Sequence, residues 1–161
     1  MRFIARHFRD RLRAALGAHE SAERVAAAWA LGVAIALSPF VFLHTVLALA
    51  LAFLFRLNKP DVVLGTLVMN PWTQPLYFPA AIWLGTKLTG VRLAWEAVPA
   101  PAELLSRAFW ESGNHFVRSV VLTWGIGSSL ISVIVGPLTF VALRCLILSL
   151  RHRHAASART S

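Results

Sequence analysis

The chain has 161 residues, of which 57% are hydrophobic and only 14% are charged. A water-soluble domain of this length carries roughly a quarter charged residues, so the composition excludes an ordinary soluble domain. The formal net charge of +9 does not indicate a nucleic-acid partner, because basic residues beside apolar stretches are typical of a membrane surface.

Three stretches contain no Asp, Glu, Lys or Arg: residues 25–55, 62–86 and 119–143. Each is longer than the ~18 to 20 residues that a bilayer-spanning helix needs. All seven carboxylates and all sixteen basic residues lie outside these stretches, as expected where burial of a charge in hydrocarbon is costly. The sequence predicts an all-α, multi-pass membrane protein whose membrane domain covers residues 22–150.

Residues 1–21 predict a basic amphipathic helix. Arg2, Arg6, Arg9 and Arg13 share one face at helical spacing, beside an apolar face. Such a helix lies at the membrane surface, where its arginines reach anionic head groups. A solvated helix that only sets the orientation of the chain is the alternative.

The first apolar segment of the membrane domain, over 22–55, contains Ser38-Pro39 near its middle. Proline removes a helical hydrogen-bond donor and disfavours helical backbone in the residue before it. We therefore expect two half-helices, over 22–37 and 39–55, in a segment that is either bent or re-entrant.

The second segment, over 62–90, repeats this pattern with Asn70-Pro71 near its middle. Gly32 precedes the proline of the first segment by seven residues, and Gly65 precedes that of the second by six. This parallel is compatible with a weak internal duplication or with chance. Paired broken helices point to a binding site near the membrane midplane.

The last part of the membrane domain predicts an interfacial loop or helix over 91–115 and a long transmembrane helix over 116–150. The long helix carries Ser128, Ser132 and Gly136 at four-residue spacing. A stripe of small residues permits close approach of another helix. We expect this stripe to contact a helix of the same chain or of a second copy.

The basic residues predict that both termini are cytoplasmic. Six arginines precede the first apolar stretch, and four accompany or follow the last one, including those of the basic tail over 151–161. If the first segment is re-entrant, the loop with Arg56 and Lys59 stays cytoplasmic. The second and third segments then cross the membrane.

Short motifs follow one another along about residues 20–90. They are SPF at Ser38, HT at His44, RLN from Arg56 to Asn58, NPWT at Asn70 and a tyrosine at Tyr77. Together these motifs resemble the bacterial membrane-protein family catalogued as domain of unknown function 2062. The resemblance implies a small bacterial inner-membrane protein of a family sometimes joined to glycosyltransferase domains, and it supplies no established activity.

Familiar catalytic patterns are absent from the sequence. There is no H-E-x-x-H, no G-x-S-x-G, no pair of acids and no Cys/His ligand cluster. No carboxylate in the apolar stretches is available to orient His44 as a base. We therefore expect neither an enzyme nor a bound metal or cofactor. Cys145 is the single cysteine, so no internal disulfide forms.

The polar residues of the broken segments instead suggest an anion site. Ser38 and Asn70 are suited to be N-caps, and proline after each suits the first helical turn. Half-helix N-termini inside the membrane bind anions. The leading hypothesis is binding or translocation of an anionic lipid or a small anionic solute. The proposed ligand-binding residues are Ser38, Pro39, His44, Thr45, Arg56, Asn58, Asn70, Pro71, Thr73 and Tyr77.

Simpler interpretations stand beside this one. Pro39 and Pro71 can merely kink packed helices, and His44 can be a neutral donor between helices. Arg56 and Lys59 fit ordinary anchors at the membrane surface. The rival function is a non-catalytic adaptor or scaffold for a membrane enzyme, such as a glycosyltransferase acting on lipid-linked sugars. The expected partners are anionic lipids and either a membrane protein or a second copy, with no nucleic acid.

Overall fold

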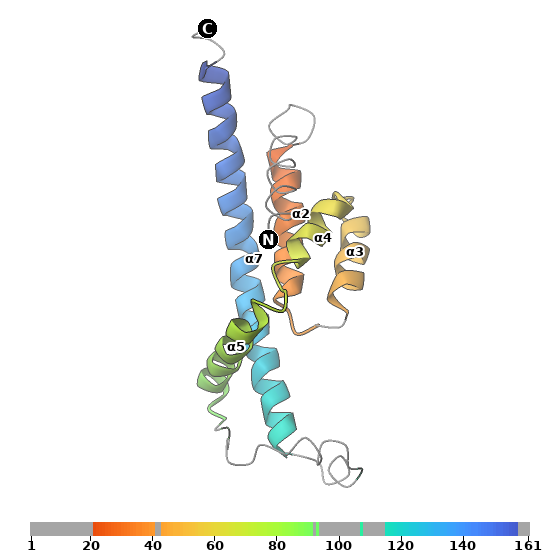
Figure 1. The fold of residues 1–161 in the computed structure, drawn as a ribbon, viewed down its shortest axis with the longest axis vertical. Coiled ribbons are helices and arrows are strands. Elements are labelled where there is room, and N and C mark those ends of the chain that lie inside the picture. The colour runs from red at the N-terminus through yellow and green to blue at the C-terminus, as the bar shows by residue number, and fades with distance from the viewer. Residues whose placement is uncertain (1–20, 41–42, 92, 94–106, 108–114, 158–161) are drawn as a thin grey trace. The chain divides into compact units, whose positions relative to one another are not determined.

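The computed structural model describes residues 21–40, 43–91, 93, 107 and 115–157, apart from the side chains of 153–157. Every regular element within these residues is an α-helix, as the sequence predicts (Figure 1). The predicted surface helix over 1–21 and nearly all of the interfacial segment over 91–115 lie outside the described residues. The helices are α2 (Ala22–Ala36), α3 (His44–Leu54), α4 (Lys59–Thr66), α5 (Gln74–Thr89) and α7 (His115–Ser157).

The chain forms two compact units. Unit 1 comprises Met1–Asn70 together with Ser132–Ser161, and unit 2 comprises Pro71–Ile131. Helix α7 therefore contributes its C-terminal part to unit 1 and its N-terminal part to unit 2. It also runs on through the start of the predicted basic tail, as far as Ser157.

Helix α2 forms the centre of unit 1. The Ser21 side chain accepts a hydrogen bond from the backbone N–H of Arg24 at 3.2 Å and caps the first turn. Glu23 adds a negative charge, which the positive helix end favours. Most residues of α2 are buried, and many are alanines that let the neighbouring helices approach closely. The buried positions are Ala22, Val25, Ala26, Ala28, Trp29, Ala30, Gly32, Val33, Ile35 and Ala36.

The first segment is broken at the predicted proline, but the second half-helix starts later than expected. Helix α2 ends at Ala36, and α3 begins only at His44 rather than at Pro39. The residue before α3 is Leu43, whose side chain makes no capping bond. The prediction of a half-helix over 39–55 is therefore wrong at its N-terminal end, because the chain completes a turn before helical backbone resumes.

The second segment is also broken where the sequence predicts. Helix α4 ends at Thr66 and α5 begins at Gln74, so the break includes Asn70-Pro71. Pro75 lies in the first turn of α5, where its missing N–H removes no helical hydrogen bond.

Helices α2 and α4 cross at two glycines, Gly32 and Gly65. A Cβ atom on Gly32 would lie 2.8 Å from Gly65 Cα and would collide with the carbonyl oxygen of Val62. A Cβ atom on Gly65 would lie 2.7 Å from the carbonyl oxygen of Trp29. The two glycines that occupy parallel positions in the sequence thus meet in space and allow the backbones to touch.

The C-terminal part of α7 packs against α2 in unit 1. The Ser132 hydroxyl donates a hydrogen bond to the carbonyl oxygen of Ala34 at 2.6 Å. A Cβ atom on Gly136 would lie 3.0 Å from the Ala34 side chain. Further along, Arg144 pairs with Glu23 at 3.2 Å. The predicted role of the small-residue stripe in helix contact is confirmed for these two stripe positions.

In unit 2, α5 packs against the N-terminal part of α7 through another pair of glycines. A Cβ atom on Gly85 would lie 2.9 Å from Thr123 Cα, and one on Gly127 would lie 2.9 Å from the backbone nitrogen of Gly85. The rings of Phe78 and Trp124 stack with centroids 5.3 Å apart. Close backbone contact and aromatic packing together fix this pair of helices.

One described helix has the length and composition of a membrane span. It is α7, whose candidate span covers His115–His152, with only 11% of the apolar window buried within the protein. Helices α2 and α5 contain 15 and 16 residues, or roughly 22 to 24 Å, which is shorter than the ~30 Å hydrocarbon layer. The described residues therefore contain one candidate span.

Candidate functional site

The predicted ligand-binding residues are divided between the two units. Seven belong to unit 1, and Pro71, Thr73 and Tyr77 belong to unit 2. The seven do not form one cluster along the chain either. Ser38 and Pro39 follow α2, His44 and Thr45 begin α3, Arg56 and Asn58 connect α3 to α4, and Asn70 follows α4.

Ser38 and Asn70 do not cap the helices that follow them. The Ser38 hydroxyl donates to the carbonyl oxygen of Ile35 at 2.6 Å. The Asn70 side-chain amide donates to the carbonyl oxygen of Leu67 at 3.3 Å. Both bonds reach back three residues to the end of the preceding helix, where carbonyl groups lack helical partners. The predicted N-cap roles of both residues are wrong.

In unit 2, Thr73 is the residue before α5 and its side chain makes no capping bond. Tyr77 lies in the first turns of α5 and forms a side-chain hydrogen bond with Ser128 of α7. Ser128 is fully buried. The Tyr77 hydroxyl therefore belongs to the contact between α5 and α7.

The connection from α3 to α4 brings two basic residues together in unit 1. Helix α3 ends at Leu54, and Arg56 adopts the left-handed backbone conformation with φ 53°. The N–H of Leu57 donates to the carbonyl of Ala52 at 2.8 Å, and the N–H of Arg56 donates to the carbonyl of Phe53 at 3.2 Å. This pair of bonds is a Schellman motif, in which glycine usually occupies the left-handed position.

An arginine in the left-handed conformation carries a steric cost of ~1 to 2 kcal/mol, which glycine avoids. Arg56 is the one non-glycine residue with positive φ in the described ranges. Its side chain is exposed, so burial does not offset the strain. Backbone strain of this kind is characteristic of functional positions.

A hollow of about 340 Å³ lies beside this turn and is lined by Phe53, Arg56, Leu57 and Lys59. The Lys59 ammonium lies 4.8 Å from the centroid of the Phe53 ring, which is a cation–π contact. Asn58 precedes α4, and its backbone carbonyl accepts a hydrogen bond from Val62. The hollow therefore presents two cations and no carboxylate. Together Phe53, Leu54, Phe55, Arg56 and Lys59 form what we term the hairpin end.

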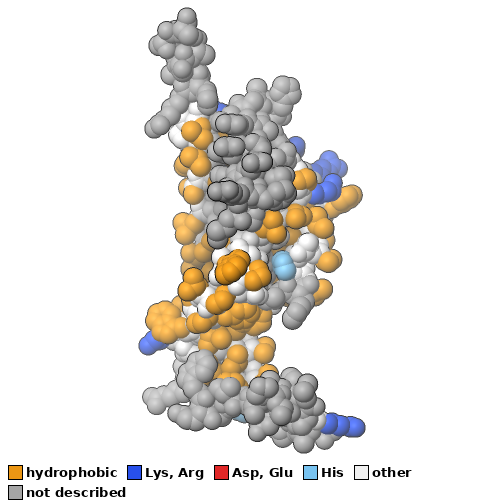
Figure 2. All heavy atoms as spheres, in the orientation of Figure 1, with side chains coloured by type: hydrophobic (Ala, Val, Ile, Leu, Met, Phe, Trp, Pro, Cys, Tyr) orange, Lys and Arg blue, Asp and Glu red, His pale blue; other side chains and the backbone are white. Residues whose placement is uncertain are grey.

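The hairpin end joins an apolar helix face to these charges. Helix α3 buries only Ala48 and Ala52, so most of its large side chains face outward. Figure 2 shows basic side chains in blue beside apolar side chains in orange where α3 meets α4. An exposed apolar surface of this kind marks contact with a membrane or another protein. The exposed residues are Leu43 (62%), Val46 (66%), Leu49 (39%), Phe53 (73%), Leu54 (71%) and Phe55 (60%).

The charged residues that the structure describes on α2 and on the connection from α3 to α4 lie at the end where α2 begins, α3 ends and α4 begins (Figure 1). Glu23 and Arg24 lie in the first turn of α2, and Arg144 of α7 pairs with Glu23. The hairpin end adds Arg56 and Lys59. The two breaks, over 37–43 and 67–73, contain no charged residue. Among the described residues of α2, α3 and α4, the charges thus lie at one end of the helices and uncharged residues form the breaks at the other.

One buried carboxylate, Asp61, is not among the residues predicted from the sequence. It is 1% exposed and lies in the first turn of α4, where the positive helix end favours a negative charge. Its position just before an uncharged stretch makes it look like a solvated flanking residue. The signal that could have found it is the helix-start pattern of Asn58, Pro60 and an acid three residues after the asparagine.

The described ranges contain no group of three His, Cys, Asp or Glu side chains that could hold a metal ion. In the part that the structure describes, the protein is thus all-helical, with one candidate span and a basic, apolar hairpin end. The chain belongs to the family described as "Uncharacterized protein conserved in bacteria (DUF2062)", whose profile matches residues 5–156. The predicted family is confirmed, and the match extends well beyond residues 20–90. Comparisons with curated proteins and with solved structures give no match.

Proposed function

We propose that this protein is a non-enzymatic, integral protein of the bacterial inner membrane that binds an anionic lipid head group at the hairpin end. The observation that carries the proposal is Arg56. The backbone of Arg56 is strained, and glycine would be less strained at this position. Its cationic side chain is exposed and lies next to Lys59. A role in binding an anion accounts for an arginine there, since its presence costs stability.

The chemistry of the hairpin end suits a lipid better than a free anion. The guanidinium of Arg56 and the ammonium of Lys59 match the charge of a phosphate, and each is worth about 1 kcal/mol near an anionic surface. Leu54 and Phe55 are 71% and 60% exposed beside them, and these side chains favour hydrocarbon over water. A soluble anion offers nothing for the apolar side chains to contact.

The distribution of charge supports a re-entrant position for α2 and α3. Helix α3 contains 11 residues, or roughly 16 Å, about half of the ~30 Å hydrocarbon layer. A pair of helices that enters and leaves by the same surface places Glu23, Arg24, Arg56 and Lys59 at one interface. If the second segment and α7 each cross the membrane once, the basic residues then face the cytoplasm together with both termini.

This proposal moves the anion site away from the half-helix N-termini. Ser38 and Asn70 bond to carbonyl oxygens at helix C-terminal ends, which carry partial negative charge and do not attract anions. A route for translocation past the two prolines therefore has no support from these residues. We accordingly propose binding rather than transport as the leading function.

Native mass spectrometry of the full-length protein in detergent tests the proposal. Phosphatidylglycerol should bind more tightly than phosphatidylcholine. The double variant Arg56→Gln with Lys59→Gln should weaken binding of phosphatidylglycerol about 30-fold, because it removes two cations that contribute ~1 kcal/mol each. Arg24→Gln removes one charge from the start of α2 and serves as the control. A loss of about fivefold in the control, the share of one cation, would reduce the effect to general surface charge and contradict a site at the hairpin end.

A competition arm identifies the part of the lipid that is recognised. Glycerol 3-phosphate carries the phosphate without acyl chains, and it should fail to displace phosphatidylglycerol at millimolar concentration. Displacement would instead indicate a site for a small anionic solute, with the apolar side chains of the hairpin end serving only as anchors.

The second candidate function is a membrane adaptor, and the outer face of α3 favours it. Val46 and Leu49 are 66% and 39% exposed on a helix that contains no Asp, Glu, Lys or Arg, which suits contact with a transmembrane helix of another protein or of a second copy. Photo-crosslinking from position 46 in intact cells distinguishes the two. A single protein adduct would favour the adaptor, and adducts with lipid alone would favour the lipid-binding function.

A further inference from the structure

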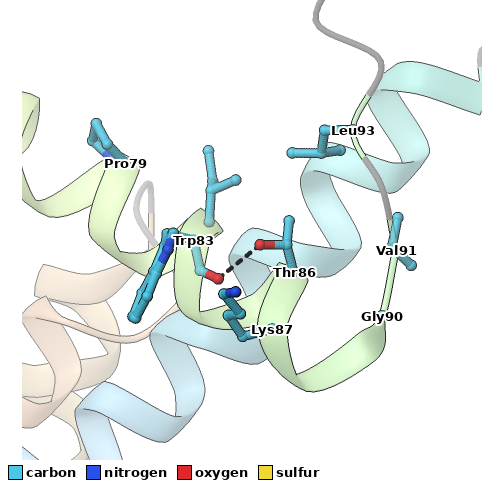
Figure 3. Close-up of a pocket in the computed structure, with 8 residues that line it drawn as sticks. Pro79, Trp83, Thr86, Lys87, Gly90, Val91 and Leu93 are labelled. Atoms are coloured by element: carbon cyan, nitrogen blue, oxygen red, sulfur yellow. Dashed lines mark hydrogen bonds between the residues drawn. The ribbon is translucent and has the colours of Figure 1, made fainter.

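A second hollow lies in unit 2, along α5 and the residues that follow it. Its volume is about 510 Å³, and its lining includes Pro79, Ile82, Trp83, Lys87 and Leu93. Figure 3 shows Trp83, Thr86 and Lys87 on α5 and Leu93 on the segment beyond the helix. This volume lies within the range of ~300 to 1,000 Å³ that is typical of small-molecule sites. We term this hollow the α5 groove.

The groove arises from the way in which α5 ends. Gly90 terminates the helix in the left-handed conformation, with φ 69°. The Thr89 hydroxyl donates to the Gly85 carbonyl at 2.8 Å and accepts a hydrogen bond from the N–H of Val91 at 3.3 Å. The chain therefore turns immediately after the helix, which leaves Leu93 facing the hollow instead of continuing the helix axis.

The lining is apolar along most of its length and cationic at one position. Lys87 is the charged residue of the lining, while Ile82 and the 62%-exposed Trp83 provide apolar surface. The Thr86 hydroxyl is already donated to the Trp83 carbonyl at 2.7 Å. A tryptophan one turn before a lysine near the end of an apolar helix is typical of the boundary between hydrocarbon and head groups.

A smaller hollow of about 250 Å³ adjoins the groove and shares Val91 with it. His115 and Arg118, from the first turn of α7, line this second hollow. The described residues of unit 2 include Lys87, Arg107 and Arg118 and no carboxylate. Lys87 in the first lining and Arg118 in the second are both basic, and an anionic ligand complements them.

We infer that unit 2 holds a second anionic phospholipid, with an acyl chain along Ile82 and Trp83 and its phosphate toward Lys87 and Arg118. A phospholipid is the occupant that matches an apolar groove with cations beside it. A free phosphate would leave the apolar lining in contact with water. This inference goes beyond the function proposed above, because it uses residues of the other unit and none of the hairpin end.

Counting bound lipids by native mass spectrometry tests the inference. The wild-type protein should retain two phosphatidylglycerol molecules. Lys87→Gln with Arg118→Gln should retain one and bind the second about 30-fold more weakly, because two cations near an anionic head group are lost. Lys87→Arg with Arg118→Lys keeps both charges and should retain two. Two retained lipids in the glutamine variant would overturn the inference.

A second variant tests the groove independently of charge. Thr86→Trp places a large side chain in the hollow and should reduce retention to one lipid while the hairpin end still binds. Leu88→Trp lies on the same helix outside the lining and serves as the control. If Thr86→Trp retains two lipids, the acyl chain does not occupy this groove and the inference fails.

This experiment distinguishes refutation of the proposed function from refutation of the second lipid site. If the hairpin-end glutamine variant retains two lipids while the α5-groove variant retains one, the proposed function is wrong and the second site stands. If the hairpin-end variant retains one and the groove variant retains two, only the second site is refuted. Binding of glycerol 3-phosphate with loss of the lipid would identify a soluble phosphate as the occupant and contradict the inference.

Discussion

Replacement of Arg56 by glycine should change stability and lipid binding in opposite directions. The left-handed backbone at φ 53° costs an L-residue ~1 to 2 kcal/mol relative to glycine. Glycine in turn makes the unfolded chain more flexible, which lowers stability by ~0.4 to 1 kcal/mol. The net expectation is a gain of about 0.5 to 1 kcal/mol in unfolding free energy. Loss of one guanidinium should weaken binding of phosphatidylglycerol about fivefold.

Thermal unfolding in detergent and native mass spectrometry measure the two effects in the same samples. Arg56→Gln is the matched control, because it removes the charge and keeps an L-residue in the turn, so it should weaken binding without raising stability. A fall in stability for Arg56→Gly would refute the argument from backbone strain. A rise in stability with undiminished binding would refute the argument that Arg56 serves to hold an anion.

Three further predictions concern the helix contacts. Gly32→Ala should lower stability by roughly 1 to 3 kcal/mol because its Cβ meets the α4 backbone, whereas Gly125→Ala, which meets nothing within 4 Å, should raise it by up to ~1 kcal/mol in chemical denaturation. Ser132→Ala should lower the free energy of unfolding by roughly 0.6 to 2 kcal/mol, because the hydrogen bond to Ala34 is lost. Ser132→Leu should lower it further, because the larger side chain overpacks the helix contact. Unchanged melting temperatures for both variants would indicate that this face of α7 contacts lipid. Asn70→Ala should cost ~0.5 kcal/mol or more, since its bond to the Leu67 carbonyl at 3.3 Å is lost together with its other contacts; an unchanged melting temperature would contradict a role of this side chain at the end of α4.

The sequence predicts where the apolar segments break but not where helices resume. Pro39 and Pro71 lack an N–H, and each disfavours helical backbone before it, so both breaks follow from local chemistry. The prediction that Ser38 and Asn70 cap the next helices failed. A polar side chain beside a break can bond to the helix on either side, and here the Ser38 hydroxyl and the Asn70 amide both donate to the preceding helix, while Leu43 and Thr73 are the N-cap residues of the following ones. Local preference alone does not decide between the two directions.

The contact between Gly32 and Gly65 shows a different limit. Their parallel positions are visible in the sequence, and small residues are known to permit close helix packing. That the two glycines lie against each other depends on the path of α3, which brings α4 back along α2. The sequence alone supplies the small residues, while the fold selects which of them form a pair.

Arg56 illustrates why the hairpin end was only partly predictable. Its basic neighbourhood is evident from the sequence, and Pro60 correctly signals the start of α4. No sequence rule places an arginine in the left-handed position of a Schellman motif, because glycine dominates that position. The strain, and with it the strongest argument for a binding role, becomes visible only in the backbone conformation.

The arrangement of charge within unit 1 links the fold to the proposed function. Helices α2 and α3 run in opposite directions, so residues far apart in sequence, such as Arg24 and Arg56, lie at the same end of the helices (Figure 1). A sequence in which every charge lies outside the apolar stretches is compatible with charges on both membrane faces. The reversal of the chain at the first proline places these charges at one end. That reversal brings the cations of a short, apolar helix pair together at one end, which is where the proposed function needs them to meet the phosphate of an anionic lipid.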